Sequence, residues 1–391
     1  MGRPRSRRRR YGTPGHRSHR GRPDPSHGLD PSAGRPPAVR GRALADGLVQ
    51  LLFGPPAPLK RRNVALLLLC AALAALLCLA PSGPLSNEEE RAWERVRAAQ
   101  DHLASCRAAR GMGPSAEDPF STGLIGVEWS PLTTTLGSLP SKQASTNPVW
   151  AVLFLRWFDR LGLKSGDRVA FLSSASFPGL LLSGLAAAEE RGLDVLLIAS
   201  LGASTWGANE VSFPLPVILS ELRLGGYLST KAAFYSLGGD DERGGGFPDE
   251  GAAILKESAE AEGVPLVFGL GSVVEAKKEA LRAFSPRLVV QIGGGRANLG
   301  DDEVVLSLPP GLLDASFADR GGNGLIASAL QEGWPVLHLL NLAEVARREG
   351  IPFDGRPVRR GPAPFRRLRA LAGGGLFLLL LVRYRRWELS D

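Results

Sequence analysis

The sequence predicts an α/β protein with a doubly wound, mostly parallel sheet, preceded by an N-terminal transmembrane helix. Two observations predict this fold. Short apolar runs bounded by turn residues alternate with helical segments from Trp150 to Arg348, as in proteins built from strand–helix–strand units. Before them, residues 64–80 form an apolar run without one charge, close to the length that crosses a hydrocarbon core.

The charges of the chain are unevenly distributed. Residues 1–62 hold 15 Lys and Arg against three Asp, and residues 356–391 hold nine Arg against two acidic residues. Because the whole chain of 391 residues has a net charge of +8, the middle must carry about −11. Basic flanks stay on the cytoplasmic side of a membrane. We therefore expect a cell-membrane protein with a cytoplasmic N-terminus and an extracytoplasmic main domain.

Residues 1–59 are predicted to be a disordered, basic, cytoplasmic arm. They are rich in Arg, Pro, Gly and Ser, and such a composition cannot bury enough apolar surface to fold. A basic arm can contact nucleic acid or anionic lipid. Aromatic residues are not interleaved with the arginines, so we expect lipid contact and no nucleic-acid partner. The alternative is that the natural chain starts further downstream.

Two apolar segments are candidates for membrane helices. In the segment 60–82, Leu and Ala cover every helical face and three basic residues come first, which favours a transmembrane helix over a buried core helix. The basic tail 356–391 contains a shorter apolar run, 370–382, flanked by Arg. We expect this run to be a second short span, and an interfacial or re-entrant helix is the alternative.

The elements of the body follow from periodicity and turn residues. A helix at 87–110 is expected to stand the body off the membrane, and 111–355 is expected to be the extracytoplasmic α/β domain. The predicted strands are 168–174, 194–202, 232–239, 265–271, 287–295, 303–311 and 335–341. The predicted helices are 150–162, 177–191, 250–262, 273–284, 324–332 and 342–348. Right-handed crossovers would bring the carboxyl ends of the strands to one edge, where α/β sheets bind ligands.

Serines follow the first predicted strand and precede a helix. They are Ser173, Ser174 and Ser176. Hydroxyl groups at such a place cap the helix or bind an anion. A nucleophilic serine is the third interpretation, although the G-x-S-x-G motif of α/β hydrolases is absent.

Two glycine-rich loops add further candidate residues. In SLGGDDERGGG, the carboxylates of Asp240 and Asp241 suit a cation or a substrate amine, and a solvated loop is the alternative. In IGGGRAN, backbone N–H groups and a cation form a nest for a carboxylate or a phosphate. The residues of this nest are Gly293, Gly294, Gly295, Arg296 and Asn298. No Lys and Ser/Thr follow the glycines, so the loop is not a P-loop.

The segment 125–150 is dense in hydroxyl groups. It contains one carboxylate, Glu128, and one cation, Lys142. Three of its hydroxyls are consecutive: Thr133, Thr134 and Thr135. General sequence rules interpret this segment as a polar loop.

The histidines of the body do not predict a metal site. His102 and His338 lie in different elements without ligand spacing, so we expect no metal. His338 lies inside an apolar strand, where a hydrogen-bonded core histidine is expected. No motif identifies a cofactor.

Several unusual runs occur together and in order. They are EWSPLTTTLGSLPSKQASTNP, FLSSASFPG, ASLGASTWGAN, SLGGDDERGGG, IGGGRANLG, LPPGL, RGGNGLIA and VLHLLNL. Together they resemble the poly-γ-glutamate system protein family over residues 60–355. The resemblance implies a membrane-anchored accessory component of poly-γ-glutamate synthesis or export. Its partners would be the other membrane subunits of that system and the γ-linked glutamate polymer. The resemblance implies no catalytic residue.

Three hypotheses follow. The first is an accessory component that binds polymer or partner subunits through strand-end loops. The second is a hydrolase or transferase acting on γ-glutamyl bonds, with Ser174 or Ser176 as nucleophile. The third is a non-catalytic scaffold. Because the acidic body repels a polyanion, polymer binding requires a local basic groove, for which Arg296, Lys142 and Lys231 are candidates. Convergence of the predicted loops on one cleft would favour binding or catalysis.

Overall fold

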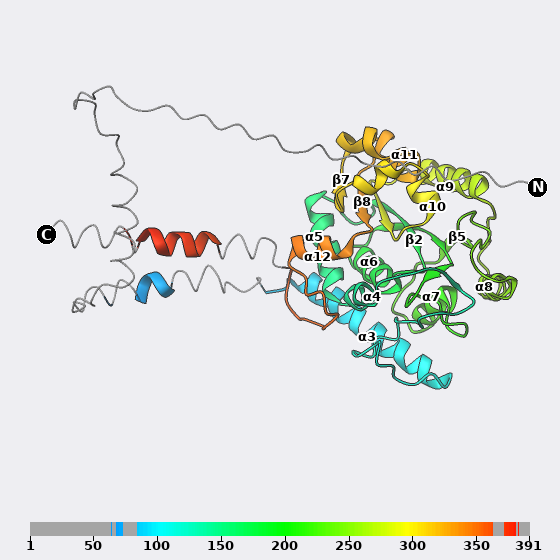
Figure 1. Ribbon diagram of the computed structural model, residues 1–391, viewed down its shortest axis with the longest axis horizontal. Helices are drawn as coiled ribbons and strands as arrows, with labels where there is room; N and C mark the ends of the chain where they lie inside the picture. The colour runs from blue at the N-terminus through cyan, green and yellow to red at the C-terminus, as the bar shows by residue number, and fades with distance from the viewer. Residues whose placement is uncertain (1–63, 65–67, 73–83, 363–370, 381, 383–391) are drawn as a thin grey trace, which may run out of the picture. The chain divides into compact units, whose positions relative to one another are not determined.

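The computed structural model describes residues 64, 68–72, 84–362, 371–380 and 382. Residues 84–362 have an α/β fold with a mostly parallel sheet, which confirms this part of the predicted fold (Figure 1). The predicted arm 1–59 lies outside the described residues, as does most of the predicted span 60–82. Residues 371–380 are helical. Within the described part of the chain, no helix combines the length and the hydropathy that a membrane crossing requires.

The main sheet has six strands in the order β5-β3-β2-β6-β8-β7. Their bounds are β2 Arg168–Ser174, β3 Asp194–Ser200, β5 Ala232–Ser236, β6 Leu288–Ile292, β7 Gly311–Leu313 and β8 Val336–Leu339. All neighbouring pairs are parallel except β7 with β8. The chain runs from β2 through β3 to β5 on one side and then returns to β6 on the other side of β2. Strand order therefore reverses between β2 and β6, where open α/β sheets place their ligands.

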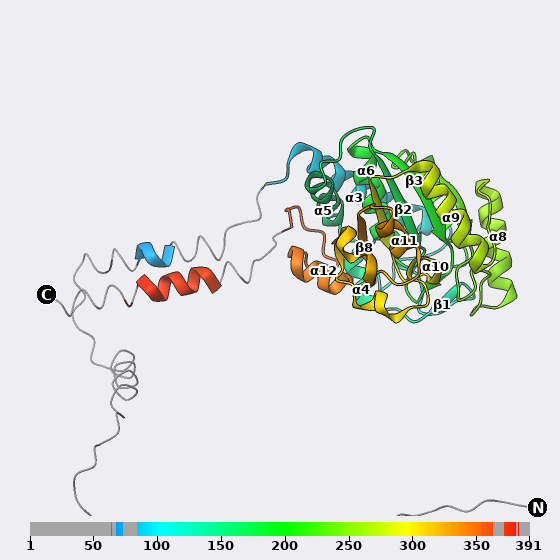
Figure 2. The ribbon, with the colours of Figure 1, turned by 90° about the horizontal axis from the view of Figure 1, so that it is seen from above.

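Helices cover both faces of this sheet (Figure 2). Val169 and Phe171 of β2 join one buried cluster with α5 and α6, and Ala170 and Leu172 join a second cluster with α9 and α11. This alternation follows from the two-residue period of a strand. The helices are α3 Asn87–Ala109, α4 Leu139–Ser145, α5 Val149–Arg160, α6 Pro178–Glu190, α7 Leu215–Leu224, α8 Asp249–Glu262, α9 Leu270–Phe284, α10 Arg296–Leu299, α11 Leu325–Gln331 and α12 Leu342–Glu349.

Two of the predicted strands are wrong. In 265–271, only Leu266 makes a bridge, to Tyr235 of β5. Gly269 then turns the chain with φ +86° and α9 begins at Leu270. In 303–311, residues Glu303–Ser307 form a 3₁₀ helix because the Asp302 side chain accepts a hydrogen bond from the Val304 N–H. Apolar periodicity alone does not separate such short turns from buried strands.

The segment 125–150 is not only a polar loop. It contains the short strand β1, Thr133–Thr135, which pairs in parallel with β4, Ala203–Ser204. It also contains α4, which is capped by the Ser138 side chain. This second, two-stranded sheet places the segment over the carboxyl end of β3, since β4 follows β3 directly.

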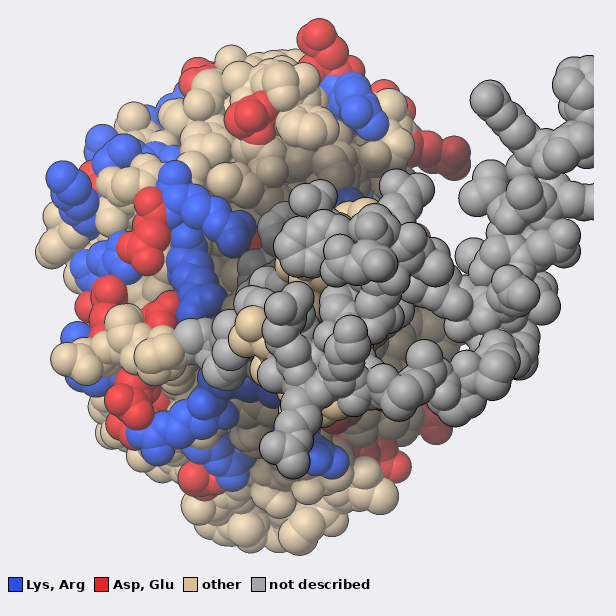
Figure 3. Space-filling model, turned by 90° about the vertical axis from the view of Figure 1, so that its left-hand side faces the viewer, with Lys and Arg blue, Asp and Glu red and all other residues tan. Residues whose placement is uncertain are grey.

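Helix α3 packs against the α/β domain rather than standing apart from it. Ala92, Val96, Ala99 and Leu103 are fully buried in the cluster that also holds α5 and α6. Its first turns make ion pairs with the domain, including Glu89 with Arg156 and Glu88 with Arg191. Figure 3 shows basic and acidic side chains interspersed on the part of the face that it draws in colour. The long-range ion pairs fix α3 to the domain.

Candidate functional site

A cavity of about 320 Å³ lies at the carboxyl ends of the strands. Residues after β2, β3, β5 and β6 line it, together with residues from β1 to α4. We call it the strand-end cavity. Its hydroxyl side chains are those of Thr134, Thr135, Ser174, Ser176, Ser200 and Ser204. The cavity therefore occupies the place where the strand order reverses, as expected for a ligand site.

The strand-end cavity brings together most of the residues predicted from the sequence. Those that line it are Thr134, Thr135, Lys142, Ser174, Ser176, Asp240, Gly294, Gly295 and Arg296. Those that do not line it are Glu128, Thr133, Ser173, Asp241, Gly293 and Asn298. The four predicted segments thus converge on one site. Some of their residues do not line the cavity but hold the loops that form it.

Two residues of the segment 125–150 lie away from the cavity. Thr133 is buried, and its hydroxyl oxygen accepts hydrogen bonds from the Ser130 N–H at 3.0 Å and from Asn209 Nδ2 at 2.9 Å. These bonds hold β1 against the loop after β4, so Thr133 is a structural residue. Glu128 is exposed and lies outside the cavity wall.

Asp241 and Ser173 hold their own loops. Asp241 Oδ1 accepts hydrogen bonds from the backbone N–H groups of Arg243 at 2.9 Å and Gly245 at 3.0 Å. These bonds keep the pKa of the Asp241 carboxyl below its usual value. The Asp241 carboxylate therefore holds the backbone of the glycine loop. Of the two aspartates, only Asp240 lines the cavity. Ser173 is buried and donates to the Ser174 carbonyl at 3.1 Å.

A buried polar chain supports the turn after β6. His338 of β8 and Gln291 of β6 form a hydrogen bond between Nδ1 and Oε1 at 2.7 Å, and Gln291 Nε2 donates to the Gly293 carbonyl. Burial lowers the pKa of His338 to about 4, so its imidazole is neutral. The expected hydrogen-bonded core histidine is confirmed. Through Gln291 it holds Gly293 in the turn that leads to the cavity.

A second buried group lies behind the same turn. Asn298 Oδ1 accepts a hydrogen bond from Lys277 Nζ at 3.0 Å. Lys277 is fully buried on α9, and burial lowers the pKa of its ammonium group while Glu242 opposes that shift. Asn298 therefore anchors α10 to α9 and does not face the ligand space.

Lys142 is the buried amine of the cavity wall. Its side chain is 1 % exposed. Nζ contacts the Ser176 carbonyl, lies 2.6 Å from Ser204 Oγ, and stands 3.7 Å from the centre of the Phe177 ring. Burial lowers the pKa of Lys142 to about 7, because a charged amine loses its hydration in the protein interior. No carboxylate among the described residues forms an ion pair with it.

Several residues that line the cavity carry donors without a partner among the described residues. Ser174 Oγ is buried and makes no hydrogen bond to any described residue. The backbone N–H groups of Gly294 and Gly295 likewise find no acceptor in the described part of the chain. Gly294 is exposed and Gly295 is half-buried, so only the Ser174 hydroxyl is a buried polar group without a partner, which costs about 1–3 kcal/mol. The arrangement suits a ligand that supplies acceptor oxygens, such as a carboxylate or a phosphate.

Some residues of the site were missed from the sequence, and three of them carry polar side chains with a clear role. Ser200 and Ser204 line the cavity, and Lys277 supports it. A signal for the serines existed, since ASLGAS continues directly from the predicted strand 194–202, just as FLSSAS does from the first strand. Lys277 gave no signal because it lies on an amphipathic helix between exposed charges.

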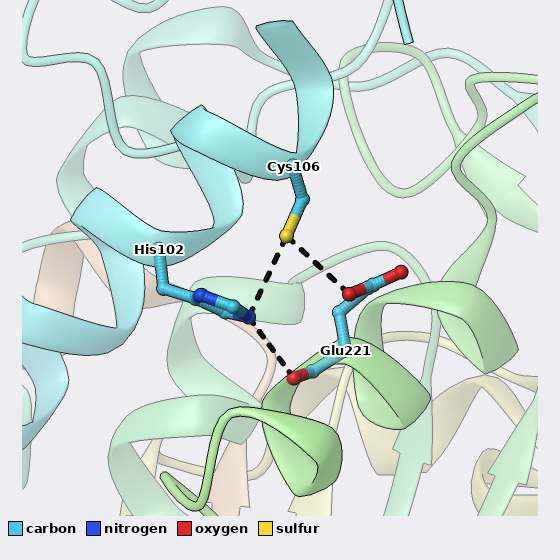
Figure 4. A group of neighbouring side chains, drawn as sticks. All are labelled: His102, Cys106 and Glu221. Carbon is cyan, nitrogen blue, oxygen red and sulfur yellow. Dashed lines mark hydrogen bonds between the residues drawn. The ribbon is translucent and has the colours of Figure 1, made fainter. Parts of the chain in front are cut away.

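A separate cluster joins α3 to α7 (Figure 4). Cys106 Sγ lies 3.5 Å from His102 Nε2 and 3.3 Å from Glu221 Oε2. Burial and the neighbouring Glu221 raise the pKa of the Cys106 thiol, so the thiol keeps its proton and donates it to Glu221 Oε2. Arg110 already pairs with Glu221 at 2.5 Å. We therefore assign the cluster as a hydrogen-bonded contact between helices.

Comparison with known protein families, with curated proteins and with solved structures gives no match to this chain.

Proposed function

We propose that the chain is a membrane-anchored accessory component of a poly-γ-glutamate synthesis or export system, and that its α/β domain binds γ-linked glutamate in the strand-end cavity. One observation supports the binding role most strongly. Segments far apart in the sequence meet in one cavity that presents unpartnered donors, namely Ser174 Oγ and the N–H groups of Gly294 and Gly295. The resemblance of the same segments to the family supports the identity of the ligand.

The chemistry of the cavity suits a carboxylate. Hydroxyl and N–H groups donate to carboxylate oxygens, and Arg296 stands at the rim with an exposed side chain. Arg296 is held by Asp301, with Nε to Oδ1 at 2.5 Å, and by the Asp240 carbonyl at 3.0 Å from Nη1. Arg296 thus offers a charge-assisted donor at the rim, while Asp301 and Asp240 offset its positive charge.

The membrane anchor is the second part of the proposal. Residues 60–82 would cross the membrane with the N-terminus in the cytoplasm, and 370–382 would form a second short span. Large apolar side chains that are exposed in both segments support membrane contact: Leu68, Leu69, Leu371, Leu378 and Leu379. The main domain would then be extracytoplasmic, next to the other membrane subunits of the system.

The contacts in the cavity also weigh against the two alternatives, a scaffold without a ligand and a hydrolase with Ser174 or Ser176 as nucleophile. A scaffold without a ligand does not require polar groups to remain unpaired inside a cavity, so convergence favours a binding protein. Ser174 has no base within hydrogen-bonding distance among the described residues, and Ser176 Oγ accepts a hydrogen bond from the Ser204 N–H at 3.0 Å. Neither serine has the neighbours of an activated nucleophile.

The binding role is tested by calorimetry with the full-length chain in detergent micelles. We expect γ-linked glutamate oligomers to bind more tightly than α-linked oligomers of the same length. Arg296→Gln should weaken binding about tenfold, because it removes a charge-assisted hydrogen bond. Arg347→Gln, at an exposed position of α12 outside the cavity, is the matched control. Undetectable binding by the natural chain, or equal affinity of both variants, would contradict the proposal.

The pathway is tested separately in the cell. Deletion of the gene is expected to reduce the amount of surface poly-γ-glutamate, and the natural gene should restore it. An unchanged amount of polymer after deletion would contradict the assignment of the chain to this system. The cavity would then be a binding site for a different carboxylate.

A further inference from the structure

Ser204 and Lys142 form a close pair inside the strand-end cavity. Ser204 lies on β4, and Lys142 lies on α4. The distance from Lys142 Nζ to Ser204 Oγ is 2.6 Å, and both residues line the cavity. The pairing of β1 with β4 fixes the two elements, because Thr135 registers with Ser204. The pair is thus positioned by the secondary structure and not by flexible loops alone.

Either an ammonium group or a neutral amine can make the three contacts of Lys142, and the neutral form is the one that can act as a base. A neutral amine has two N–H donors and one lone pair. The Ser176 carbonyl can only accept, and the face of the Phe177 ring also favours an N–H. This leaves the lone pair for the third neighbour, which is the hydroxyl of Ser204. The geometry therefore allows Lys142 to accept the Ser204 proton.

We propose that Ser204 is a nucleophile and Lys142 is its general base, so that the strand-end cavity supports acyl transfer from an amide or ester substrate that carries a carboxylate. The carboxylate preference rests on the proposed binding role, whereas the nucleophile rests on the Ser204–Lys142 geometry. A lysine base beside a serine is an established alternative to histidine in acyl transfer.

The reaction proceeds in two balanced steps. Ser204 Oγ attacks the acyl carbon while its proton moves to Lys142 Nζ, and the tetrahedral intermediate then expels the amine or alcohol, which takes that proton. The products of this step are a serine ester and the free leaving group. A water molecule then attacks the ester with Lys142 again as base, and proton return to Ser204 Oγ releases the carboxylic acid.

Other serines of the cavity lack this arrangement. Ser176 contributes its carbonyl to Lys142 and its hydroxyl oxygen to the Ser204 N–H. Ser176 is thus a positioning residue that holds both members of the pair. Ser204 is the serine whose Oγ lies within hydrogen-bonding distance of the amine.

The charged surroundings of Lys142 are simple. The loop after β2 contributes the Ser176 carbonyl and the Phe177 ring, and β4 contributes the Ser204 hydroxyl. The turn before α4 contributes the backbone of Gly137. None of these neighbours carries a charge. The charged side chains that line the same cavity are Asp240 and Arg296, both exposed at its rim and neither paired with Lys142. Titration of Lys142 should therefore dominate the pH dependence of the reaction.

The test uses a fluorophosphonate probe on the full-length chain in detergent micelles, followed by peptide mapping. Attack by Ser204 Oγ forms an O–P bond, breaks the P–F bond and passes the proton to Lys142. We expect one modified residue, Ser204, and a labelling rate that rises with pH through about 7. Ser204→Ala should abolish labelling and Lys142→Met should slow it at least 100-fold, whereas the control Ser258→Ala on α8 should not change it.

Each outcome decides the proposal. An unlabelled natural chain, a label on Ser174 or Ser176, or persistent labelling of Ser204→Ala would overturn it. Far-UV circular dichroism and urea denaturation of Ser204→Ala report whether that variant is folded, whether or not the chain binds γ-linked glutamate. Labelling at Ser204 together with undetectable glutamate binding would retain the nucleophile and remove the proposed ligand, so the two failures are distinguishable.

Discussion

Gly293 and Ser174 pack so closely that a methyl group on Gly293 would overlap Ser174 Oγ and lie 3.3 Å from Ser174 Cβ. Ser174 ends β2 and Gly293 follows β6, the two strands between which the strand order reverses. Gly293 also has φ +87°, a conformation that side chains disfavour. The contact fixes the spacing of the serine loop and the glycine loop at the base of the strand-end cavity.

Replacement of Gly293 should therefore damage both the stability and the cavity. We expect Gly293→Ala to lower the free energy of unfolding by about 2 kcal/mol or more, because it combines backbone strain with overlap at Ser174. Gly294→Ala is the control, since its Cβ would lie 3.4 Å from Leu340 Cδ1, an ordinary contact. Urea denaturation of both variants measures the difference. Equal stability of the two variants would show that the β2 and β6 loops are not locked together.

The ion pair that joins α3 to Arg191 should contribute more to stability than an exposed ion pair within α12. Arg191 is largely buried and contacts Glu88 Oε1 through Nε at 2.6 Å and Asp159 Oδ1 through Nη2 at 2.8 Å. We expect Arg191→Met to cost about 1–3 kcal/mol, because it leaves a partly buried carboxylate without its partner. Arg347→Met, which removes an exposed pair within α12, should change stability by less than about 0.5 kcal/mol. Thermal denaturation of Arg191→Met and Arg347→Met measures the two losses of stability. Equal losses would show that the Arg191 ion pairs do not specifically attach α3 to the domain.

His338 should make the domain acid-sensitive. The unfolded chain binds a proton at His338 near pH 6.5, whereas the folded protein does so only near pH 4. Between these values the unfolded state binds more protons, so stability falls as the pH falls. His338→Gln removes this group and can still donate a hydrogen bond to Gln291. From pH 6.5 to 4.5 the natural chain should lose about 2 kcal/mol more than the variant. Urea titrations at both pH values measure this difference. If the natural chain and His338→Gln lose the same free energy of unfolding, His338 has an ordinary pKa.

Much of the fold was predictable because strand–helix alternation is a local signal. The runs around Phe171, Leu197 and Val290 are buried on both faces, and such strands have continuous apolar sequences. The failures lie where local signals are ambiguous. The 303–311 run is apolar enough for a strand, yet the Asp302 cap converts it to a 3₁₀ helix.

The candidate site was predictable in part for a related reason. Parallel strands bring their carboxyl ends together, so Ser174, Asp240 and Gly294 could be expected to converge. The burial of Lys142 could not be predicted, because it depends on the pairing of β1 with β4 across about 70 residues. The pair that this burial creates, Lys142 with Ser204, was absent from the sequence interpretation for the same reason.

The burial of Lys142 should appear in the pH dependence of stability. In the unfolded chain its pKa is 10.5, and in the folded protein burial lowers the pKa to about 7. Between these values the unfolded state holds a proton that the folded state has released, so the free energy of unfolding rises with pH by about 1 kcal/mol per pH unit. Below pH 7 both states are protonated, and this contribution stays at its minimum. Lys142→Met lacks the titrating group.

We therefore expect the stability of the natural chain relative to Lys142→Met to increase by about 2 kcal/mol from pH 7 to pH 9. Urea denaturation of both proteins at half-unit pH intervals measures this difference and cancels the titration of distant groups. The natural chain with Arg347→Met as a second reference controls for the loss of a positive charge in general. A difference that stays constant from pH 7 to pH 9 would mean that Lys142 keeps an ordinary lysine pKa. Lys142 would then be charged at neutral pH, and it could not accept the proton of Ser204.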